Sequence, residues 1–144
     1  MTLVELLVVM AVIGLIVGIS VPAFTGYAKQ IRLKTAVRQV MGLVSLARNT
    51  AISGHQEYAV VVDGDNQILQ IVNVASGDSL EHVVHLPSHV TVELQVGGEP
   101  AEDSQFVFRP TGALTGRTIS LVLSDGDRQQ AILVTGATGA VIVQ

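Results

Sequence analysis

The chain has 144 residues, enough for one domain, and carries a formal net charge of −4; 49% of its residues are hydrophobic and only 14% are charged. A soluble domain usually has about a quarter charged residues, so this apolar composition excludes intrinsic disorder. The chain has no cysteine, which excludes a disulfide framework, a thiol nucleophile and a thiolate zinc site, and its acidic balance argues against a generally nucleic-acid-binding surface.

Charge is distributed unevenly along the chain. Residues 1–28 contain a single charged residue, Glu5. Residues 29–48 contain five basic residues and no acid, whereas residues 49–144 contain three basic residues and eleven acids. We therefore expect three parts: an apolar membrane or filament-core helix over residues 1–28, an amphipathic helix over residues 29–53, and an acidic head over residues 54–144.

The uncharged run from Leu6 to Phe24 is 19 residues long. As a helix it would span about 28 Å, close to the thickness of a bilayer core. A secretory signal peptide is disfavoured because the run is too long and no basic segment precedes it. A buried core helix is disfavoured because the run has no polar face. The sequence therefore predicts a segment that resides in a membrane.

The residues around this run form a dense motif. Thr2, Leu3 and Glu5 precede it, Gly14 lies within it, and Pro22 falls near its end. This arrangement closely resembles the N-terminus of mature type IV pilins and type II secretion pseudopilins, in which a charge, a proline and an uncharged run stand at set spacings. The resemblance covers about residues 1–30.

The resemblance implies how the N-terminus is processed. In that family a prepilin peptidase and methyltransferase removes a basic leader after a glycine and N-methylates the new first residue. Because the pattern places the glutamate fifth in the mature protein, we expect Met1 to be that first residue. A basic leader upstream would also hold the N-terminus in the cytoplasm and leave the head outside.

Glu5 is the one carboxylate in the apolar segment, where an unpaired charge is costly. The resemblance implies that Glu5 of one subunit meets the free N-terminus of a neighbour and sets the register of assembly; the alternative is a glutamate that snorkels to the headgroups. Pro22 has no N–H for the carbonyl of Gly18, so we expect the helix to kink or melt there. The resemblance implies that the stretch Gly14–Pro22 unwinds in a filament.

After Pro22 the helical pattern continues, and Gly54 suits a C-cap. Basic residues lie mostly off the apolar stripe of this second part. They would face either the acidic surface of a neighbouring subunit or anionic headgroups, or form a solvated face. The stripe is Leu33, Val37, Val40, Met41, Val44, Ala47 and Ala51, and the basic face is Lys29, Arg32, Lys34 and Arg38.

The remainder of the chain predicts an all-β head. Alternating runs at 57–62 and 67–74 flank an Asp-Gly-Asp-Asn turn, and runs at 118–123 and 130–135 flank Asp-Gly-Asp, so each pair predicts a hairpin. Runs at 80–86 and 90–96 around Pro87 predict another. Residues 105–109 and 140–143 complete the strands. A long helix on such antiparallel strands is the α+β architecture of pilins.

The head also resembles that of the GspH/FimT pseudopilins. The resemblance rests on residues 108–112 (Phe-Arg-Pro-Thr-Gly), the strands at 118–121 and 131–134, and a glycine-rich final strand. Members of that family serve type II secretion, type IV pilus tips or DNA uptake. Some DNA-uptake members use basic residues near the C-terminus, and here residues 136–139 contain none.

Other polar clusters are expected to be structural or solvated. Asp-Gly turns are ordinary hairpin chemistry, and the spacing of their acids does not match a calcium loop. Histidines at 82 and 85 would point to opposite faces of a strand, which disfavours a zinc site. We therefore expect neither a catalytic site nor a cofactor. The residues considered were Asp63, Asp65, Asn66, Asp125 and Asp127 for calcium, and His82, His85 and His89 for zinc.

These observations predict a pilin-like subunit that resides in the inner membrane and is polymerised by an assembly platform into a periplasmic or cell-surface filament of like subunits. The expected function is a type II secretion pseudopilus that drives protein export. The alternatives are a type IV pilus or competence pilin, or a minor tip subunit that binds DNA or an exoprotein. Clustering of Arg109, Arg117 and Arg128 on one face would favour that last alternative. Nucleic acid is otherwise not an expected partner.

Overall fold

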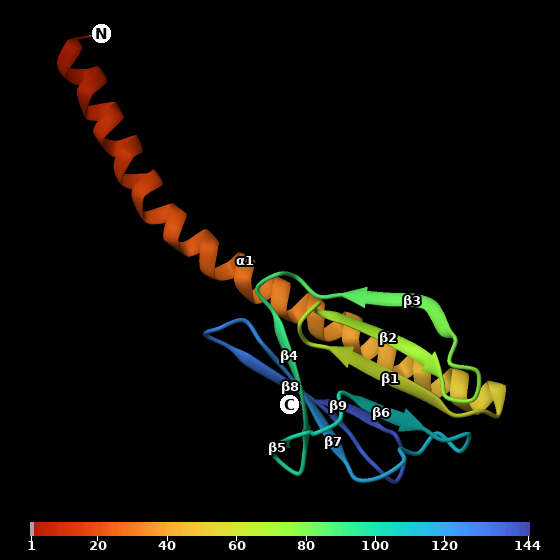
Figure 1. Cartoon of the computed structure of the whole chain (residues 1–144). Coiled ribbons are helices and arrows are strands. Elements are labelled where there is room, and N and C mark those ends of the chain that lie inside the picture. The colour runs from red at the N-terminus through yellow and green to blue at the C-terminus, as the bar shows by residue number, and fades with distance from the viewer. Residues whose placement is uncertain (1) are drawn as a thin grey trace. The chain divides into compact units, whose positions relative to one another are not determined.

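The computed structural model describes the backbone of residues 2–144 and the side chains of all of these except residues 21–26, 28 and 29. The chain divides into two compact units, Met1–Arg32 and Leu33–Gln144. The long helix α1 (Leu3–Gly54) supplies the secondary structure of the first unit and the first element of the second (Figure 1). We call the second unit the head unit.

In the first unit, the part of α1 from Leu3 to Ser20 is apolar except for Glu5 and Ser20. The stretch Leu3–Ser20 has a mean hydropathy of 2.7 and none of it is buried, so its length and composition suit a membrane span. The Ser20 hydroxyl donates to the Ile16 carbonyl at 2.7 Å, which satisfies a polar side chain within the helix. The backbone is helical throughout Gly14–Pro22. The local melting expected at Pro22 is thus not observed in the single chain, and unwinding in a filament stays a prediction.

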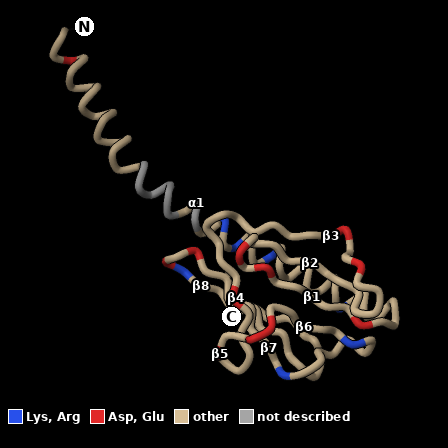
Figure 2. The backbone as a smooth tube through the Cα atoms, viewed as in Figure 1, with Lys and Arg blue, Asp and Glu red and all other residues tan. Residues whose placement is uncertain are grey.

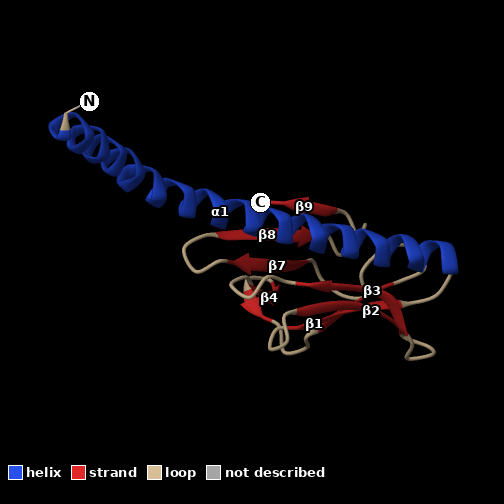
Figure 3. Ribbon diagram, turned by 90° about the horizontal axis from the view of Figure 1, so that it is seen from above, coloured by secondary structure: helices blue, strands red, loops and turns tan. Residues whose placement is uncertain are grey.

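The head unit packs the C-terminal part of α1 on two antiparallel sheets (Figure 3). One sheet has the order β3-β2-β1-β6 and the other β5-β4-β7-β8-β9. This is the expected α+β pilin-like architecture. The strands are β1 (Tyr58–Asp63), β2 (Ile68–Asn73), β3 (Ser79–His85), β4 (Thr91–Val96), β5 (Glu99–Pro100), β6 (Gln105–Phe108), β7 (Ile119–Ser124), β8 (Gln129–Val134) and β9 (Val141–Val143).

One core joins the helix to both sheets. The predicted helical stripe is buried except for Met41, which is half-buried and packs against the core. Each sheet directs alternate side chains to the same interior, as the two-residue period of strands requires. Phe108 on β6 is the largest fully buried side chain among the described residues. The centroid of its ring lies 5.8 Å from the centroid of the Phe106 ring, and the two rings are arranged edge to face.

The prediction that residues 80–86 and 90–96 form a hairpin is wrong. Strand β3 pairs with β2, whereas β4 pairs with β7 and β5 in the other sheet. Residues 87–89 therefore carry the chain from one sheet to the other. Hydrophobic alternation predicts that both segments are strands but says nothing of the partner of either. The hairpins β1–β2 and β7–β8 are confirmed.

The end of α1 also differs in detail from the prediction. Gly54 is the last helical residue, and the residue in the left-handed region is His55, with φ of 51°. Histidine is tolerated in this region more readily than branched residues are. The glycine therefore marks the helix end but does not supply the left-handed turn.

Candidate functional site

The start of α1 is closed by a reciprocal cap. The Thr2 amide donates to Glu5 Oε2 at 2.8 Å and the Thr2 hydroxyl lies 3.3 Å from the same oxygen, while the Glu5 amide donates to the Thr2 hydroxyl at 3.3 Å. The Thr2 carbonyl accepts the first helical bond, from Leu6. This is a capping box, in which Thr2 is the N-cap and Glu5 the third helical residue.

The cap gives Glu5 a local partner inside the chain. Both Thr2 donors reach Oε2, and no donor among the described residues reaches Oε1. The Thr-x-x-Glu spacing in the sequence is the signal that predicts such a cap. Met1 lies outside the described residues, so its pairing with a carboxylate is untested.

Two further residues of the motif lie on the apolar helix. A Cβ added at Gly14 or Gly18 would meet no atom within 4 Å in the single chain, so the helix surface there is open. Such small residues permit close approach of a second helix in lipid. The side chain of Pro22 lies outside the described residues.

The predicted basic face is only partly described. Arg32, Lys34 and Arg38 are exposed on α1, and the side chain of Lys29 lies outside the described residues. Arg48, the fifth basic residue, behaves differently. It is half-buried, and its Nε donates to the Gly112 carbonyl at 3.2 Å. It joins the helix to the loop after β6, and this role had no signal in the sequence.

The three arginines of the acidic half lie at separate places in the head unit. Outside α1, the Lys and Arg positions in Figure 2 are apart from one another along the backbone. Arg117 precedes β7 and Arg128 lies in the turn that follows it, so a strand of six residues, about 20 Å, separates them. Arg109 follows β6 in the other sheet, and its Nε lies 3.3 Å from the Thr115 hydroxyl. This arrangement does not favour the DNA-binding alternative.

The acidic turns serve local structure. Asp63 Oδ1 accepts the Asn66 amide at 3.0 Å and Oδ2 accepts the Asn66 side-chain nitrogen at 2.7 Å. The hydrogen bonds from the Asn66 side chain and then its backbone hold the pKa of Asp63 below its ordinary value. His82, His85 and His89 are exposed, and within the described residues no three His, Cys, Asp or Glu gather as metal ligands would.

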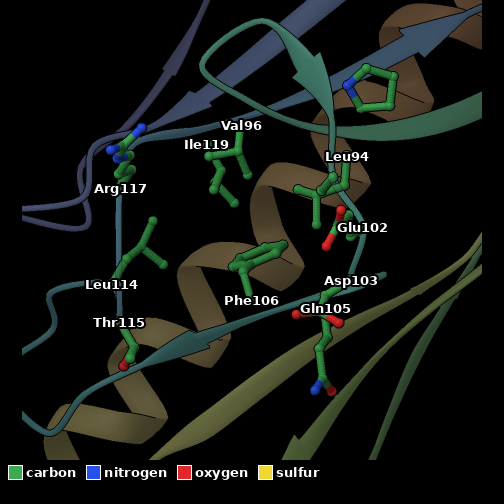
Figure 4. Close-up of a pocket in the computed structure, with 12 residues that line it drawn as sticks. Leu94, Val96, Glu102, Asp103, Gln105, Phe106, Leu114, Thr115, Arg117 and Ile119 are labelled. Carbon is green, nitrogen blue, oxygen red and sulfur yellow. The ribbon is translucent and has the colours of Figure 1, made fainter.

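The head unit contains a groove of about 420 Å³ between β6, the edge strand of one sheet, and strands β4, β5 and β7 of the other. Its apolar side chains come from β4, β6 and β7, from the loop between β6 and β7 (Figure 4), and from Pro100 and Ala101 at and just after β5. Glu102 and Asp103 lie on one side of these side chains and Arg117 on the other (Figure 4). The sequence did not indicate this groove, because its walls are strands that are distant along the chain.

Comparison with known proteins gives the family. The family model described as type II transport protein GspH matches residues 36–139. The chain belongs to the GspH family. This GspH-family chain is therefore a pilin-like structural filament subunit and not an enzyme. None of the curated proteins compared with it matches.

Solved structures show the same fold as this GspH-family chain. The type IV minor pilin FimU of Pseudomonas aeruginosa has a TM-score of 0.66 and 16% identity, over 82% of this chain and 92% of FimU. The minor pseudopilin EpsH from the type 2 secretion system of Vibrio cholerae has a TM-score of 0.61 and 18% identity, over 78% of this chain and 96% of EpsH. At such identities the likeness establishes the fold alone.

Proposed function

We propose that this GspH-family chain is a minor subunit of a type II secretion pseudopilus, held in the inner membrane by residues 1–28 and then extracted into a periplasmic filament. The observation that carries this proposal is the exposed apolar helix Leu3–Ser20, which has only Glu5 as a charge. So much exposed apolar surface needs lipid or the helices of other subunits to cover it. Subunit addition at the base would then push cargo outward.

The capping box suggests how Glu5 acts in assembly. Thr2 occupies one carboxylate oxygen and lowers the cost of the charge in an apolar setting. The other oxygen stays available for the α-amino group of Met1 of a neighbouring subunit. A paired charge in such surroundings depends strongly on position, so this contact would fix the register of one subunit on the next.

The remaining assembly residues follow from the same scheme. Gly14 would allow helices to approach closely, and the stretch up to Pro22 would unwind in the filament. The basic face of Lys29, Arg32, Lys34 and Arg38 would meet the acidic surface of another subunit or anionic headgroups. The prepilin peptidase and methyltransferase would process Met1, and the secretion platform would receive the membrane-held subunit.

Variants at the cap test this proposal in the native cell. We expect Glu5→Gln to stay in the membrane and to be lost from pseudopili, measured by cross-linking to other pilin-like subunits and by exoprotein secretion. Thr2→Val, which loses the hydroxyl, should reduce incorporation, while the matched control Thr2→Ser, which keeps it, should not. Incorporation of Glu5→Gln at the wild-type level would contradict the role assigned to this carboxylate.

A type IV pilus is the second candidate, because the FimU minor pilin shares the fold. Deletion of the gene separates the two functions. Loss of exoprotein secretion with surface pili intact would support the pseudopilus, whereas loss of surface pili with secretion intact would support a pilus. Mass spectrometry of the filament-associated protein should show an N-methylated Met1 in either case.

A further inference from the structure

The groove between the sheets has an apolar floor that the fold itself does not fill. Leu94, Phe106, Leu114 and Ile119 are each buried, yet all four line the groove. They come from three strands and one loop and converge in the close-up (Figure 4). The groove volume of about 420 Å³ lies within the range of roughly 300–1,000 Å³ that is common for binding sites.

One wall of the groove holds a short stretch of open sheet edge, at Gln105. Further along β6 the edge is covered, because Phe108 pairs with Leu114 and the Arg109 amide donates to the Ala113 carbonyl. Strand β6 is the last strand of its sheet. The Ser104 carbonyl accepts the Val62 amide, so the backbone groups of residues 104, 106 and 108 face β1. Those of Gln105 and Val107 therefore face away from β1. The Val107 carbonyl accepts the Thr115 amide, but no strand lies beside Gln105, which lines the groove.

The charges at the groove are mostly acidic. Glu102 and Asp103 line it, and a second hollow that shares Asp103 with it adds Glu93. Within the described residues the carboxylates of Glu102 and Asp103 have no ion-pair or hydrogen-bond partner. Arg117 is the one basic residue among the groove's lining residues, and it lies across the apolar side chains from the two acids (Figure 4).

We propose that this groove binds an extended, basic segment of a partner protein. The segment adds to the free edge of β6, with its backbone bonded to Gln105. One of its apolar side chains lies over Phe106, and a neighbouring Lys or Arg faces Glu102 and Asp103. Charge complementarity selects a basic rather than an acidic segment. This inference rests on the head unit alone and stands or falls separately from the assembly role of Glu5.

Two synthetic peptides test the charge and the place of binding. Both are capped ten-residue peptides with alternating valines; one has lysine and the other glutamate at the intervening positions. They are titrated into the isotope-labelled full chain in neutral-detergent micelles, and backbone amide shifts are followed by NMR. The lysine peptide should bind about tenfold or more tightly than the glutamate peptide, and should shift Gln105, Val107 and Ile119. No binding at millimolar peptide, equal binding, or shifts centred on β3 or β9 would overturn the proposal.

Matched variants separate the site from overall charge. Glu102→Lys with Asp103→Lys should weaken binding of the lysine peptide about tenfold, since both carboxylates are exposed and their loss leaves the core intact. The control, Glu57→Lys with Glu81→Lys, changes the net charge equally at exposed positions that do not line the groove. Equal weakening by the two pairs would show that only net charge matters and would refute the site.

The strand-addition step has its own variant. Gln105→Pro removes an amide that faces away from β1, and proline is tolerated at such an edge position. We expect the variant to keep the amide spectrum of the folded head unit and to bind the lysine peptide about tenfold more weakly. A folded variant that binds like the wild type would exclude backbone pairing at β6.

Discussion

Gly139 lies where two loops and the helix meet, and replacing it with alanine should strongly destabilise the head unit. Its φ is +64°, and its amide donates to the Thr135 carbonyl at 2.7 Å. A Cβ at this position would overlap the carbonyl oxygen of Gly112 and lie 2.9 Å from Nε of Arg48. The same two groups form the hydrogen bond that joins α1 to the loop after β6. The added methyl group therefore strains the backbone and also pushes this bond apart.

The size of the effect can be estimated from its parts. An alanine in the left-handed region costs about 1–2 kcal/mol. Overpacking against backbone atoms that cannot simply rotate away costs about 1–3 kcal/mol. Weakening the bond from a guanidinium adds about 1 kcal/mol. We therefore expect Gly139→Ala to lower the free energy of unfolding by about 3–6 kcal/mol, and Tm by about 10–25 °C.

The assay is equilibrium and thermal unfolding of the full chain in detergent, followed by circular dichroism. Gly77→Ala is the matched control: its φ is +75°, but a Cβ there would meet no atom within 4 Å. The Gly77→Ala variant should lose only the free energy that it costs to place an alanine in the left-handed region, about 1–2 kcal/mol. If Gly139→Ala and Gly77→Ala lost the same free energy, the close packing of Gly139 on Gly112 and Arg48 would be refuted.

Three further predictions concern other parts of the head unit. Gly42 is exposed on α1 with open space around it, so Gly42→Ala should raise the free energy of unfolding by about 1 kcal/mol in thermal unfolding of the single chain; a loss would mean that something packs there. Phe108→Ala should cost about 3–5 kcal/mol in the same assay and Phe108→Leu clearly less, because the ring is fully buried. Asn66→Ala should return the pKa of Asp63 toward its ordinary value in a carboxyl NMR titration. Because the pKa of Asp63 is lowered in the folded state, its ionised carboxylate stabilises the fold at neutral pH, and this contribution is lost as the pH falls through that pKa. The Asn66→Ala variant should therefore lose less stability than the wild type as the pH falls below about 4. An unchanged dependence of stability on pH in this acidic range would contradict the hydrogen-bonding account.

The N-terminal helix was predictable because its signals are local. A run of 19 uncharged residues is sufficient to predict an apolar helix. The spacing of Glu5 and Pro22 indicated a pilin-like subunit, and residues 108–112 with the later strands indicated the GspH family that the match over residues 36–139 establishes. The buried stripe from Leu33 to Ala51 was likewise predictable, since side chains three and four residues apart share one face of a helix.

Strand positions were predictable too, but their partners were only partly so. The turns at residues 63–66 and 125–127 bring neighbouring strands together, and both hairpins formed. The segment at Pro87 also separates two strands by a short turn, yet there the chain changes sheets. Nothing local distinguishes these cases, because the choice depends on which distant strand pairs with β4, and here that strand is β7.

The sequence by itself determined the apolar helix, the amphipathic stripe, the number and place of the main strands and the filament motif, because each follows from short-range periodicity or spacing. Only the tertiary structure decided the order of the strands, the burial of Arg48 against Gly112 and the acidic groove beside β6. These features arise where residues far apart in the chain come into contact, and the free energy of such contacts depends on the packing of the whole core rather than on any one segment.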